Sequence, residues 1–273
     1  MSQHTLKITD LHVRIKEKEI IQGITLTIGS NEVVALVGPN GHGKSCLLFS
    51  IIGHPQYEVT AGDILFDDVS ISRLPPNERA KLGLFLAFQN PPEIAGVSNL
   101  DYYKSIVQDE EMRRFANFYR GVNTALNKVG LHESTSEREL NVGFSGGEKK
   151  RHELMQMLLL NPHFVLLDEI DSGLDVDAID IVADIINNRQ NNSGVLLISH
   201  YSRLFDLVKP TRAVVLIDGK IVHDGATDVL DEIDEHGYHT FVKKRNISLS
   251  KNKEEQQELL GFCATKKEAN DAR

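Results

Sequence analysis

One glycine-rich run, set between an apolar strand and an apolar helix, restricts the fold more than any other feature of the sequence. Residues 33–37 form a short β-branched apolar run typical of a buried strand, and residues 46–52 are typical of a largely buried helix. The run between them matches G-x-x-x-x-G-K-[ST], whose glycines let successive backbone N–H groups turn toward one anion. The order strand, glycine loop, helix therefore predicts a phosphate-binding loop (the P-loop). Its residues are Gly38, Pro39, Asn40, Gly41, His42, Gly43, Lys44 and Ser45.

The polar groups of this loop predict a site for the phosphates of a nucleotide and for Mg²⁺. The N-terminus of the following helix adds a positive partial charge to the anion site. Lys44 is expected to reach the β- and γ-phosphates, and the Ser45 hydroxyl is expected to ligate magnesium. An ordinary glycine-rich turn before a helix is the alternative, and the flanking strand and helix argue against it.

Length and composition favour a soluble chain in a reducing compartment. The 273 residues are enough to bury a large core without disulfides, and Cys46 and Cys263 form neither a disulfide framework nor a C-x-x-C metal site. The first residues lack the pattern of a signal peptide, and no apolar run approaches the roughly 18 residues of a membrane span. We therefore predict a cytoplasmic protein with no direct membrane insertion. The net charge of −9 argues against a nucleic-acid partner.

The order of apolar runs predicts an α/β fold with a mostly parallel sheet and helices on both faces. We expect one domain over residues 1–242, with a core of 1–90 and 163–242 and an inserted helical subdomain at 91–162. The lysine- and glutamate-rich residues 243–273 are expected to form a weakly packed tail. Expected strands cover 5–15, 20–28, 33–37, 62–68, 84–88, 164–167, 194–199 and a hairpin within 213–225, and expected helices cover 99–131, 145–160 and 177–189.

Two acids follow the apolar strand at 164–167. Asp168 stands at the end of this strand, where it could hold magnesium near Ser45. Glu169 comes next, and a carboxylate one residue beyond the metal-holding acid can polarise a water molecule in line with the γ-phosphate. A strand that ends in Asp-Glu is a weak signal by itself, and together with the P-loop it becomes a strong one.

The run Phe144-Ser145-Gly146-Gly147-Glu148 resembles the signature motif of ABC ATPases. Ser145 lies 101 residues after Lys44 and 23 before Asp168, as in that family. The resemblance implies a P-loop ATPase core with a mostly parallel sheet, an N-terminal antiparallel β subdomain and an inserted helical subdomain. It also implies a transient ATP-dependent dimer with a second copy, arranged head to tail, in which each nucleotide lies between one P-loop and the signature of the other copy.

The same resemblance assigns further site residues. Gln89 would contact magnesium or water and form the hinge of the helical insertion, and His200 would be the switch histidine near the γ-phosphate. The run 171–175, which ends at Asp175, would cross the dimer interface. Ser145, Gly146, Gly147 and Asp175 would thus act on the nucleotide of the opposite copy, while Glu169, His200 and Gln89 would act in catalysis.

One branch of the family is more similar than the rest. Three runs, at 88–97, 141–151 and 168–178, resemble SufC-type ATPases of the SUF iron–sulfur cluster assembly system. This resemblance implies SufB- and SufD-like scaffold partners, whose shape ATP-driven dimerisation would change. It covers roughly residues 5–240.

Three positions depart from the family pattern. Cys46 replaces the usual threonine near the α-phosphate, which removes a hydroxyl and is expected to cost about 1 kcal/mol of nucleotide binding. Ile170 stands where the SufC pattern usually has serine. Near residues 13–16 there is no aromatic residue to stack on adenine, so base contact should be aliphatic and weaker.

Two other functions share these motifs. The ATPase subunit of an ABC membrane transporter would have every catalytic residue in common, and only the SufC-like runs and the partner surface would distinguish it. A DNA-repair or chromosome-type ABC protein would carry a long coiled coil between P-loop and signature, for which the 101-residue spacing leaves no room.

Overall fold

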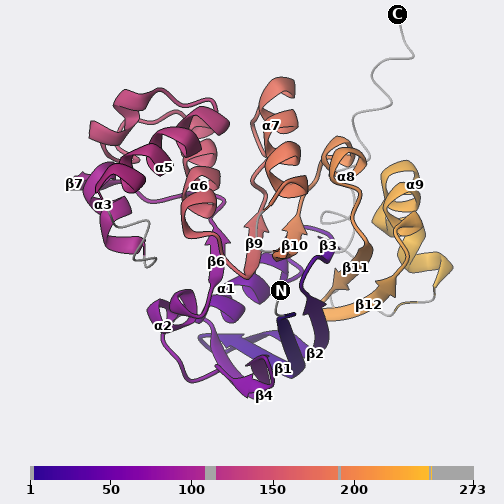
Figure 1. Cartoon of the computed structure of the whole chain (residues 1–273). Coiled ribbons are helices and arrows are strands. Elements are labelled where there is room, and N and C mark those ends of the chain that lie inside the picture. Colours follow the sequence, from indigo (N-terminus) through magenta and orange to yellow (C-terminus); the bar gives the residue numbers. More distant parts are fainter. Residues whose placement is uncertain (1–2, 108–114, 190–191, 246, 248–273) are drawn as a thin grey trace, which may run out of the picture.

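A mixed six-stranded sheet runs through the centre of the part of the chain that the structure describes (Figure 1). The structure is a computed structural model and describes residues 3–107, 115–189, 192–245 and 247. Neighbouring strands of this sheet are parallel except for the β11–β12 hairpin at one edge. In spatial order its strands are β12 (Lys220–Gly225), β11 (Arg212–Ile217), β3 (Val33–Val37), β10 (Gly194–Ile198), β9 (Phe164–Asp168) and β6 (Leu84–Ala87).

The central strands are continuously apolar because both faces of the sheet are covered. Along β3, Val34 and Leu36 pack on one side, and Val33, Ala35 and Val37 pack on the other. All five residues are buried. The expected parallel α/β core is therefore confirmed, and the P-loop follows β3 at the middle of the sheet.

An N-terminal antiparallel sheet and α1 (Lys44–Ile52) cover one face of the central sheet. The expected antiparallel β subdomain is confirmed. The strand expected at 62–68 ends earlier, because Asp67 and Asp68 adopt positive φ angles of 48° and 60° in a hairpin turn, which aspartate tolerates. In spatial order the strands are β2 (Lys18–Gly29), β1 (Thr5–Ile15), β4 (Glu58–Phe66) and β5 (Val69–Ser70).

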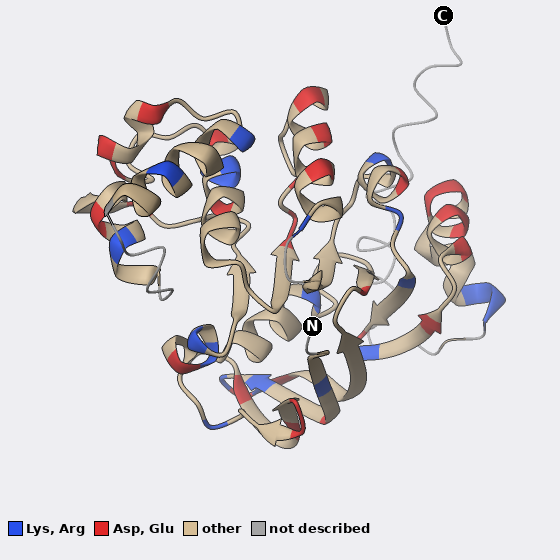
Figure 2. Ribbon diagram, viewed as in Figure 1, with Lys and Arg blue, Asp and Glu red and all other residues tan. Residues whose placement is uncertain are grey.

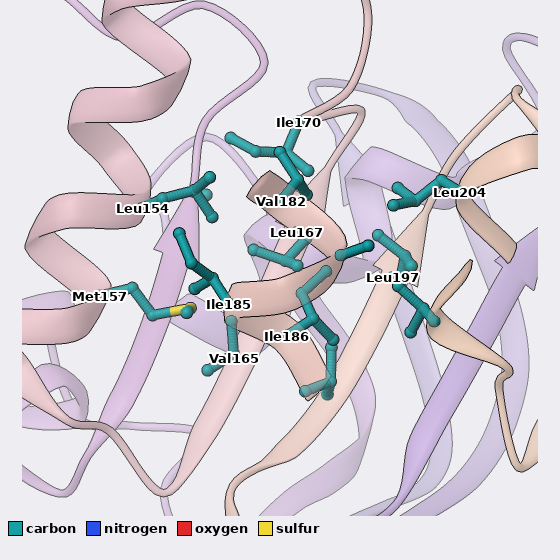
Figure 3. Packing of buried hydrophobic residues seen from close by; sticks show 14 of the residues in the cluster. Leu154, Met157, Val165, Leu167, Ile170, Val182, Ile185, Ile186, Leu197 and Leu204 are labelled. Atoms are coloured by element: carbon teal, nitrogen blue, oxygen red, sulfur yellow. The ribbon is translucent and has the colours of Figure 1, made fainter. Parts of the chain in front are cut away.

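Helices cover the opposite face of the central sheet. Figure 3 shows Leu154 and Met157 of one helix beside Val165 of β9, with Ile185 of a second helix packed against them. This layer joins the helix that carries the signature motif directly to the strand that ends at Asp168. Its helices are α6 (Gly146–Leu160), α7 (Val176–Asn187), α8 (Ser202–Val208) and α9 (Asp228–Lys244).

The stretch between β6 and α6 contains short helices and a small sheet. Among the described residues, the range 99–131, expected as a single helix, contains two helices, and residues 108–114 between them lie outside the described residues. The two-stranded sheet of β7 and β8 was not predicted, because β8 has only two residues and its partner is mostly exposed. The division into core and helical subdomain stays a prediction. These elements are β7 (Ile94–Ser98), α3 (Asn99–Ile106), α5 (Phe115–Lys128), the 3₁₀ helix η1 (Glu133–Glu137) and β8 (Glu139–Leu140), and α2 (Pro76–Lys81) precedes β6.

The end of the described chain is the helix α9, which was not predicted. It is interrupted at Gly237, whose φ of 72° and ψ of 166° are not helical. The tail expected at 243–273 begins inside this helix, and its residues 248–273, which include Cys263, lie outside the described residues.

Acidic side chains gather on the outward faces of two helices (Figure 2). On α7 these are Asp177, Asp180 and Asp184, which are exposed while the apolar face of the helix packs on the sheet. A similar exposed acidic face occurs on α9 (Figure 2). Among the described residues, no helix is both long and apolar enough to cross a membrane.

Candidate active site

The P-loop backbone passes so close to β11 that its first position must be glycine. A Cβ atom on Gly38 would lie 2.1 Å from the carbonyl oxygen of Leu216. Gly41 and Gly43 have φ angles of 76° and 107°, which side chains other than glycine rarely adopt. The three glycines therefore allow a loop conformation that residues with a Cβ atom could not adopt without strain.

Lys44 is the first residue of α1 and is buried at the centre of the P-loop. Its Nζ donates hydrogen bonds to the carbonyl oxygens of Gly38 at 2.7 Å and Pro39 at 3.1 Å. The positive charge thus lies within the curve of the loop, where the helix N-terminus adds a further positive partial charge. This is the place at which a phosphate chain would meet both.

His42 is buried, and its ring lies against the turn that joins β11 and β12. Its Nδ1 accepts a hydrogen bond from the backbone N–H of Asp218 at 2.9 Å, and its carbonyl oxygen accepts from Gly219 N–H at 3.1 Å. The Asp218-Gly219 hairpin predicted from sequence therefore supports the P-loop from behind. His42 was predicted to bind phosphate, but its side chain bonds to the β11–β12 turn. Asn40, predicted for the same role, is exposed at the tip of the loop.

Ser45 and Asp168 meet as the sequence predicted. The Ser45 hydroxyl donates to Asp168 Oδ1 at 3.1 Å, although 123 residues separate them. Two oxygen ligands at right angles around Mg²⁺, each about 2.1 Å away, are about 3 Å apart, so this pair fits a magnesium site. Asp168 is buried, and burial raises the pKa of its carboxyl group.

Glu169 is held between Gln89 and His200. Gln89 Nε2 donates to Glu169 Oε2 at 2.6 Å, and His200 Nε2 lies 3.1 Å from Glu169 Oε1. The hydrogen bond from His200 is the largest cause of the lowered pKa of Glu169, so the carboxyl group is ionised at neutral pH. We also predicted Gln89 as a ligand of the magnesium held by Ser45 and Asp168. Among the described residues, its side chain bonds to Glu169 and to neither of these two.

Strand order explains why these side chains meet. Gln89 follows β6 by two residues, Asp168 ends β9, and His200 follows β10 by two residues, and these three strands are neighbours. Their carboxyl ends lie at one edge of the parallel sheet, which is where open α/β sheets bind ligands. The P-loop follows β3, the next strand in the sheet.

The signature residues form the start of α6. Ser145 caps this helix by accepting a hydrogen bond from Glu148 N–H, and Glu148 accepts from Ser145 N–H in return. This capping box fixes the first turn, whose remaining N–H groups point out of the helix end. A Cβ on Gly147 would be 3.5 Å from Leu174 of the run 171–175. In the described part of the chain, no hydrogen bond joins Ser145, Gly146 or Gly147 to the P-loop.

Asp175 caps α7, accepting a hydrogen bond from Ala178 N–H at 2.8 Å. Its described role within one copy is therefore structural, and its predicted place at a dimer interface stays a prediction. Cys46 is buried, and burial raises the pKa of its thiol to about 12. The thiol is neutral and can supply no more than a weak hydrogen bond beside the phosphate site.

Comparison with known families decides among nucleotide-binding folds. The family model described as "ABC transporter" matches residues 21–172, which is more than half of the chain. The chain belongs to the ABC transporter family. As an ABC ATPase it binds and hydrolyses ATP, and ABC ATPases dimerise and pair with partner subunits. The matched residues include the P-loop, Gln89, the signature and Glu169, which the geometry above also selects.

Curated relatives match nearly the whole ABC domain. A probable ABC transporter ATP-binding protein from Streptococcus pyogenes serotype M3 is 44% identical over 238 residues, covering 85% of this chain and 93% of the relative. Vegetative protein 296 from Bacillus subtilis is 41% identical, covering 90% and 97%. A probable ATP-dependent transporter, ycf16, from Pyropia yezoensis is 42% identical, covering 87% and 98%.

A solved structure confirms the fold. The structure of a bacterial Atm1-family ABC exporter with ATP bound is similar to this chain, with a TM-score of 0.69 and 19% sequence identity over 91% of this chain. This chain spans 43% of the exporter chain. The similarity therefore supports the ABC ATPase fold and says nothing further about partners.

Several residues at this site were not predicted from the sequence. The Tyr238 hydroxyl of α9 accepts a hydrogen bond from Gly38 N–H at 2.9 Å, so the last described helix supports the start of the P-loop. Lys150 Nζ donates to the carbonyl oxygen of Glu169, and Ser199 donates to Asp171. Lys150 lies within a run already singled out, but no periodicity or spacing in the sequence connects Tyr238 to residue 38.

Proposed function

We propose that this chain is the ATP-hydrolysing subunit of a SUF-type iron–sulfur cluster assembly complex. ATP-driven head-to-tail dimerisation would change the shape of a SufB- and SufD-like scaffold that carries the cluster. The observation that carries the proposal is the set of three SufC-like runs, at 88–97, 141–151 and 168–178. Contacts between these runs support it further.

The three runs contact one another in the structure. Lys149 Nζ lies 2.6 Å from Glu93 Oε1, which joins the signature run to the run that contains Gln89. Asn141 Nδ2 donates to the carbonyl oxygen of Pro92 at 2.9 Å. Lys150 joins the signature run to Glu169. The residues that carry the resemblance thus form one connected unit beside the catalytic carboxylate, where a partner could sense the state of the site.

Within one copy, the residues of the P-loop bind the substrate. Lys44 and the N–H groups of the loop would hold the phosphates of ATP, and Ser45 and Asp168 would hold Mg²⁺. When bound, magnesium would neutralise charge on the β- and γ-phosphate oxygens. Glu169 would accept a proton from the attacking water, while Gln89 and His200 hold its carboxylate in place.

A second copy would complete the site. The N–H groups of the first turn of α6 would form a second anion-binding end, and in the described part of the chain Ser145 makes no hydrogen bond to the P-loop of its own copy. Two copies arranged head to tail would place the signature of one against the γ-phosphate held by the other. A scaffold that binds two copies would favour this arrangement by raising their effective concentration.

The ATPase subunit of an ABC membrane transporter is the second candidate. It is favoured by the names of two relatives, a probable ABC transporter ATP-binding protein and a probable ATP-dependent transporter. Such a subunit would use the same residues for ATP hydrolysis. It would hold a short helix of a membrane subunit at the surface of residues 90–97, where the SUF-type subunit would hold a segment of a soluble scaffold.

Capture of native partners tests the proposal. The untagged complex would be purified separately from soluble extract and from detergent-solubilised membranes, and its components identified by mass spectrometry. Soluble scaffold proteins that carry iron–sulfur ligands are the expected partners. Recovery of an integral membrane permease without such a scaffold would overturn the proposal in favour of a transporter.

A pair of variants locates the partner surface. Glu93→Lys reverses an exposed charge within 90–97 and is expected to weaken scaffold capture while ATP affinity stays unchanged. Glu17→Lys is the matched control, because Glu17 is exposed on the N-terminal hairpin far along the chain from this surface. Equal capture by both variants would remove residues 90–97 from the partner interface.

A further inference from the structure

A carboxylate inside α6 holds the backbone next to Gln89. Glu153 is 4% exposed, and its Oε2 accepts a hydrogen bond from the backbone N–H of Phe88 at 3.1 Å. Phe88 immediately precedes Gln89, whose amide contacts the catalytic Glu169. One buried side chain of the signature helix therefore fixes the point at which the chain leaves β6 and turns into the catalytic site.

The other end of this loop is also tied to α6. Asn141 donates to the carbonyl oxygen of Pro92 at 2.9 Å, and its Oδ1 lies 2.8 Å from Nδ1 of His152. His152 is neighbour to Glu153 on the helix and is buried, and Tyr103 OH lies 2.5 Å from its other ring nitrogen. Burial lowers the pKa of His152 to about 4, so the ring is neutral and can donate from Nδ1 while it accepts from Tyr103. Both ends of the segment 88–92 are thus attached to one helix.

The same helix begins with the signature residues. Glu153 lies seven residues after Gly146, the first residue of α6, which is about 10 Å along a helix. Helices move as rigid elements, so a displacement of the signature relative to the central sheet would be passed to Phe88 and Pro92. Gln89 lies between these two residues and would move with them.

We propose that Glu153 is a positioning residue for ATP hydrolysis: through Phe88 it sets the place of Gln89 against Glu169 and so couples the signature helix to the catalytic carboxylate. The inference rests on the proposed catalytic role of Gln89. It does not depend on which partner the ATPase serves. Glu153 has no described contact with the P-loop, so it should affect the rate of hydrolysis and not the affinity for ATP.

A purely structural role for Glu153 predicts a different result. Buried polar networks also stabilise a fold, and the loss of one partner is destabilising wherever it lies. Stability alone therefore does not separate the two roles. Non-additivity with Gln89 does, because a residue that acts through Gln89 has nothing left to act on once the Gln89 side chain is removed.

The experiment is a double-mutant cycle in the full-length chain. Glu153→Leu removes the acceptor for Phe88 N–H, and Glu153→Gln keeps an acceptor oxygen of similar shape. We expect Glu153→Leu to lower kcat for ATP about 10-fold with KM changed less than about 2-fold, since small misplacements of catalytic groups have effects of this size. Glu153→Gln should restore most of the rate. In a Gln89→Ala background, Glu153→Leu should cause no further loss.

Asn99→Ala is the matched control. Asn99 is a buried polar residue in the stretch between β6 and α6, and its Nδ2 donates to the carbonyl oxygen of Thr135, with no described hydrogen bond to residues 88–92. In the double variant of Asn99→Ala and Gln89→Ala, the fold-change in kcat should equal the product of the two single fold-changes. If Glu153→Leu does not fold, Asn141→Ala replaces it, because it releases the other end of the loop at Pro92.

Three outcomes would overturn the inference. Multiplicative effects on kcat of Gln89→Ala and Glu153→Leu, or Asn141→Ala in its place, would show that the network does not act through Gln89. A rise in KM at constant kcat would show an effect on binding. Wild-type kcat in Gln89→Ala would remove the catalytic role of Gln89 and with it the inference, while the partner-capture experiment would still stand as a separate test of the proposed function.

Discussion

His200 Nε2 lies 3.1 Å from Glu169 Oε1, although 31 residues separate the two in the sequence. They meet because β9 and β10 are adjacent parallel strands, with Ile198 of β10 opposite Asp168 of β9. The contact lowers the pKa of Glu169 and keeps it as a carboxylate. A carboxylate in this position can accept a proton, and a carboxamide cannot.

Substitution of Glu169 by glutamine should separate ATP binding from ATP hydrolysis. Glu169→Gln keeps the shape of the side chain but removes the proton acceptor, so ATP turnover should fall at least about 10²-fold while ATP still binds. A nucleotide-bound dimer should then accumulate. Phosphate release measures the first effect, and size-exclusion chromatography with ATP and magnesium measures the second.

Asp180→Asn provides the matched control for this substitution. Asp180 is an exposed carboxylate on α7, paired with Arg203, and it has no described hydrogen bond or ion pair with the residues of the site. Its turnover should equal that of the wild type. A Glu169→Gln protein that hydrolyses ATP normally and stays monomeric would contradict the role of Glu169.

Glu153 should make the stability of the fold depend on pH. Burial raises the pKa of its carboxyl group from 4.5 to about 7. Between these values the folded chain keeps a proton that the unfolded chain has lost, so stability from this group is present below pH 4.5 and is lost as the pH rises through 7. The shift corresponds to about 3 kcal/mol.

Denaturant unfolding at pH 5 and at pH 8 measures this effect. From pH 5 to pH 8 the wild type should lose up to about 3 kcal/mol more unfolding free energy than Glu153→Gln loses. All other titrating groups are shared by the two proteins, so this excess loss comes from Glu153. The charge of Glu153 acts on Tyr102, and His152 is its neighbour in α6; the pKa values of both, about 12 and about 4, lie outside this pH range. An identical pH dependence in both proteins would show that Glu153 titrates as an exposed carboxylate does.

Local patterns were sufficient to predict the core and much of the candidate site. The P-loop, the strand that ends at Asp168 and the helix that starts at Ser145 each depend on residues close together in sequence, and the structure places all three as expected. The links between distant segments could not be predicted. Nothing local to Tyr238 indicates Gly38, and nothing in the period of α6 indicates that Glu153 binds Phe88 N–H, because such contacts depend on the packing of whole layers.

Lys44 supplies the most direct test of the P-loop. In the structure its ammonium group is held by the carbonyl oxygens of Gly38 and Pro39, within the curve where the phosphates of ATP are expected. Lys44→Ala removes the cation from a buried position at which charge develops during phosphoryl transfer, so turnover should fall at least about 10²-fold. Phosphate release at saturating ATP measures this, and circular dichroism confirms that the variant is folded.

Lys149→Ala is the comparison that makes the Lys44 result specific. Lys149 is also a lysine near a helix N-terminus, but it pairs with Glu93 and lies away from the P-loop. Lys149→Ala removes the same charge from the chain as Lys44→Ala does, so any general effect of net charge on ATP binding should appear in both variants. Turnover should therefore fall in Lys44→Ala and stay within about 2-fold of the wild type in Lys149→Ala, since an exposed ion pair contributes little. Equal turnover in the two variants would mean that the cation in the P-loop does not act on the phosphates.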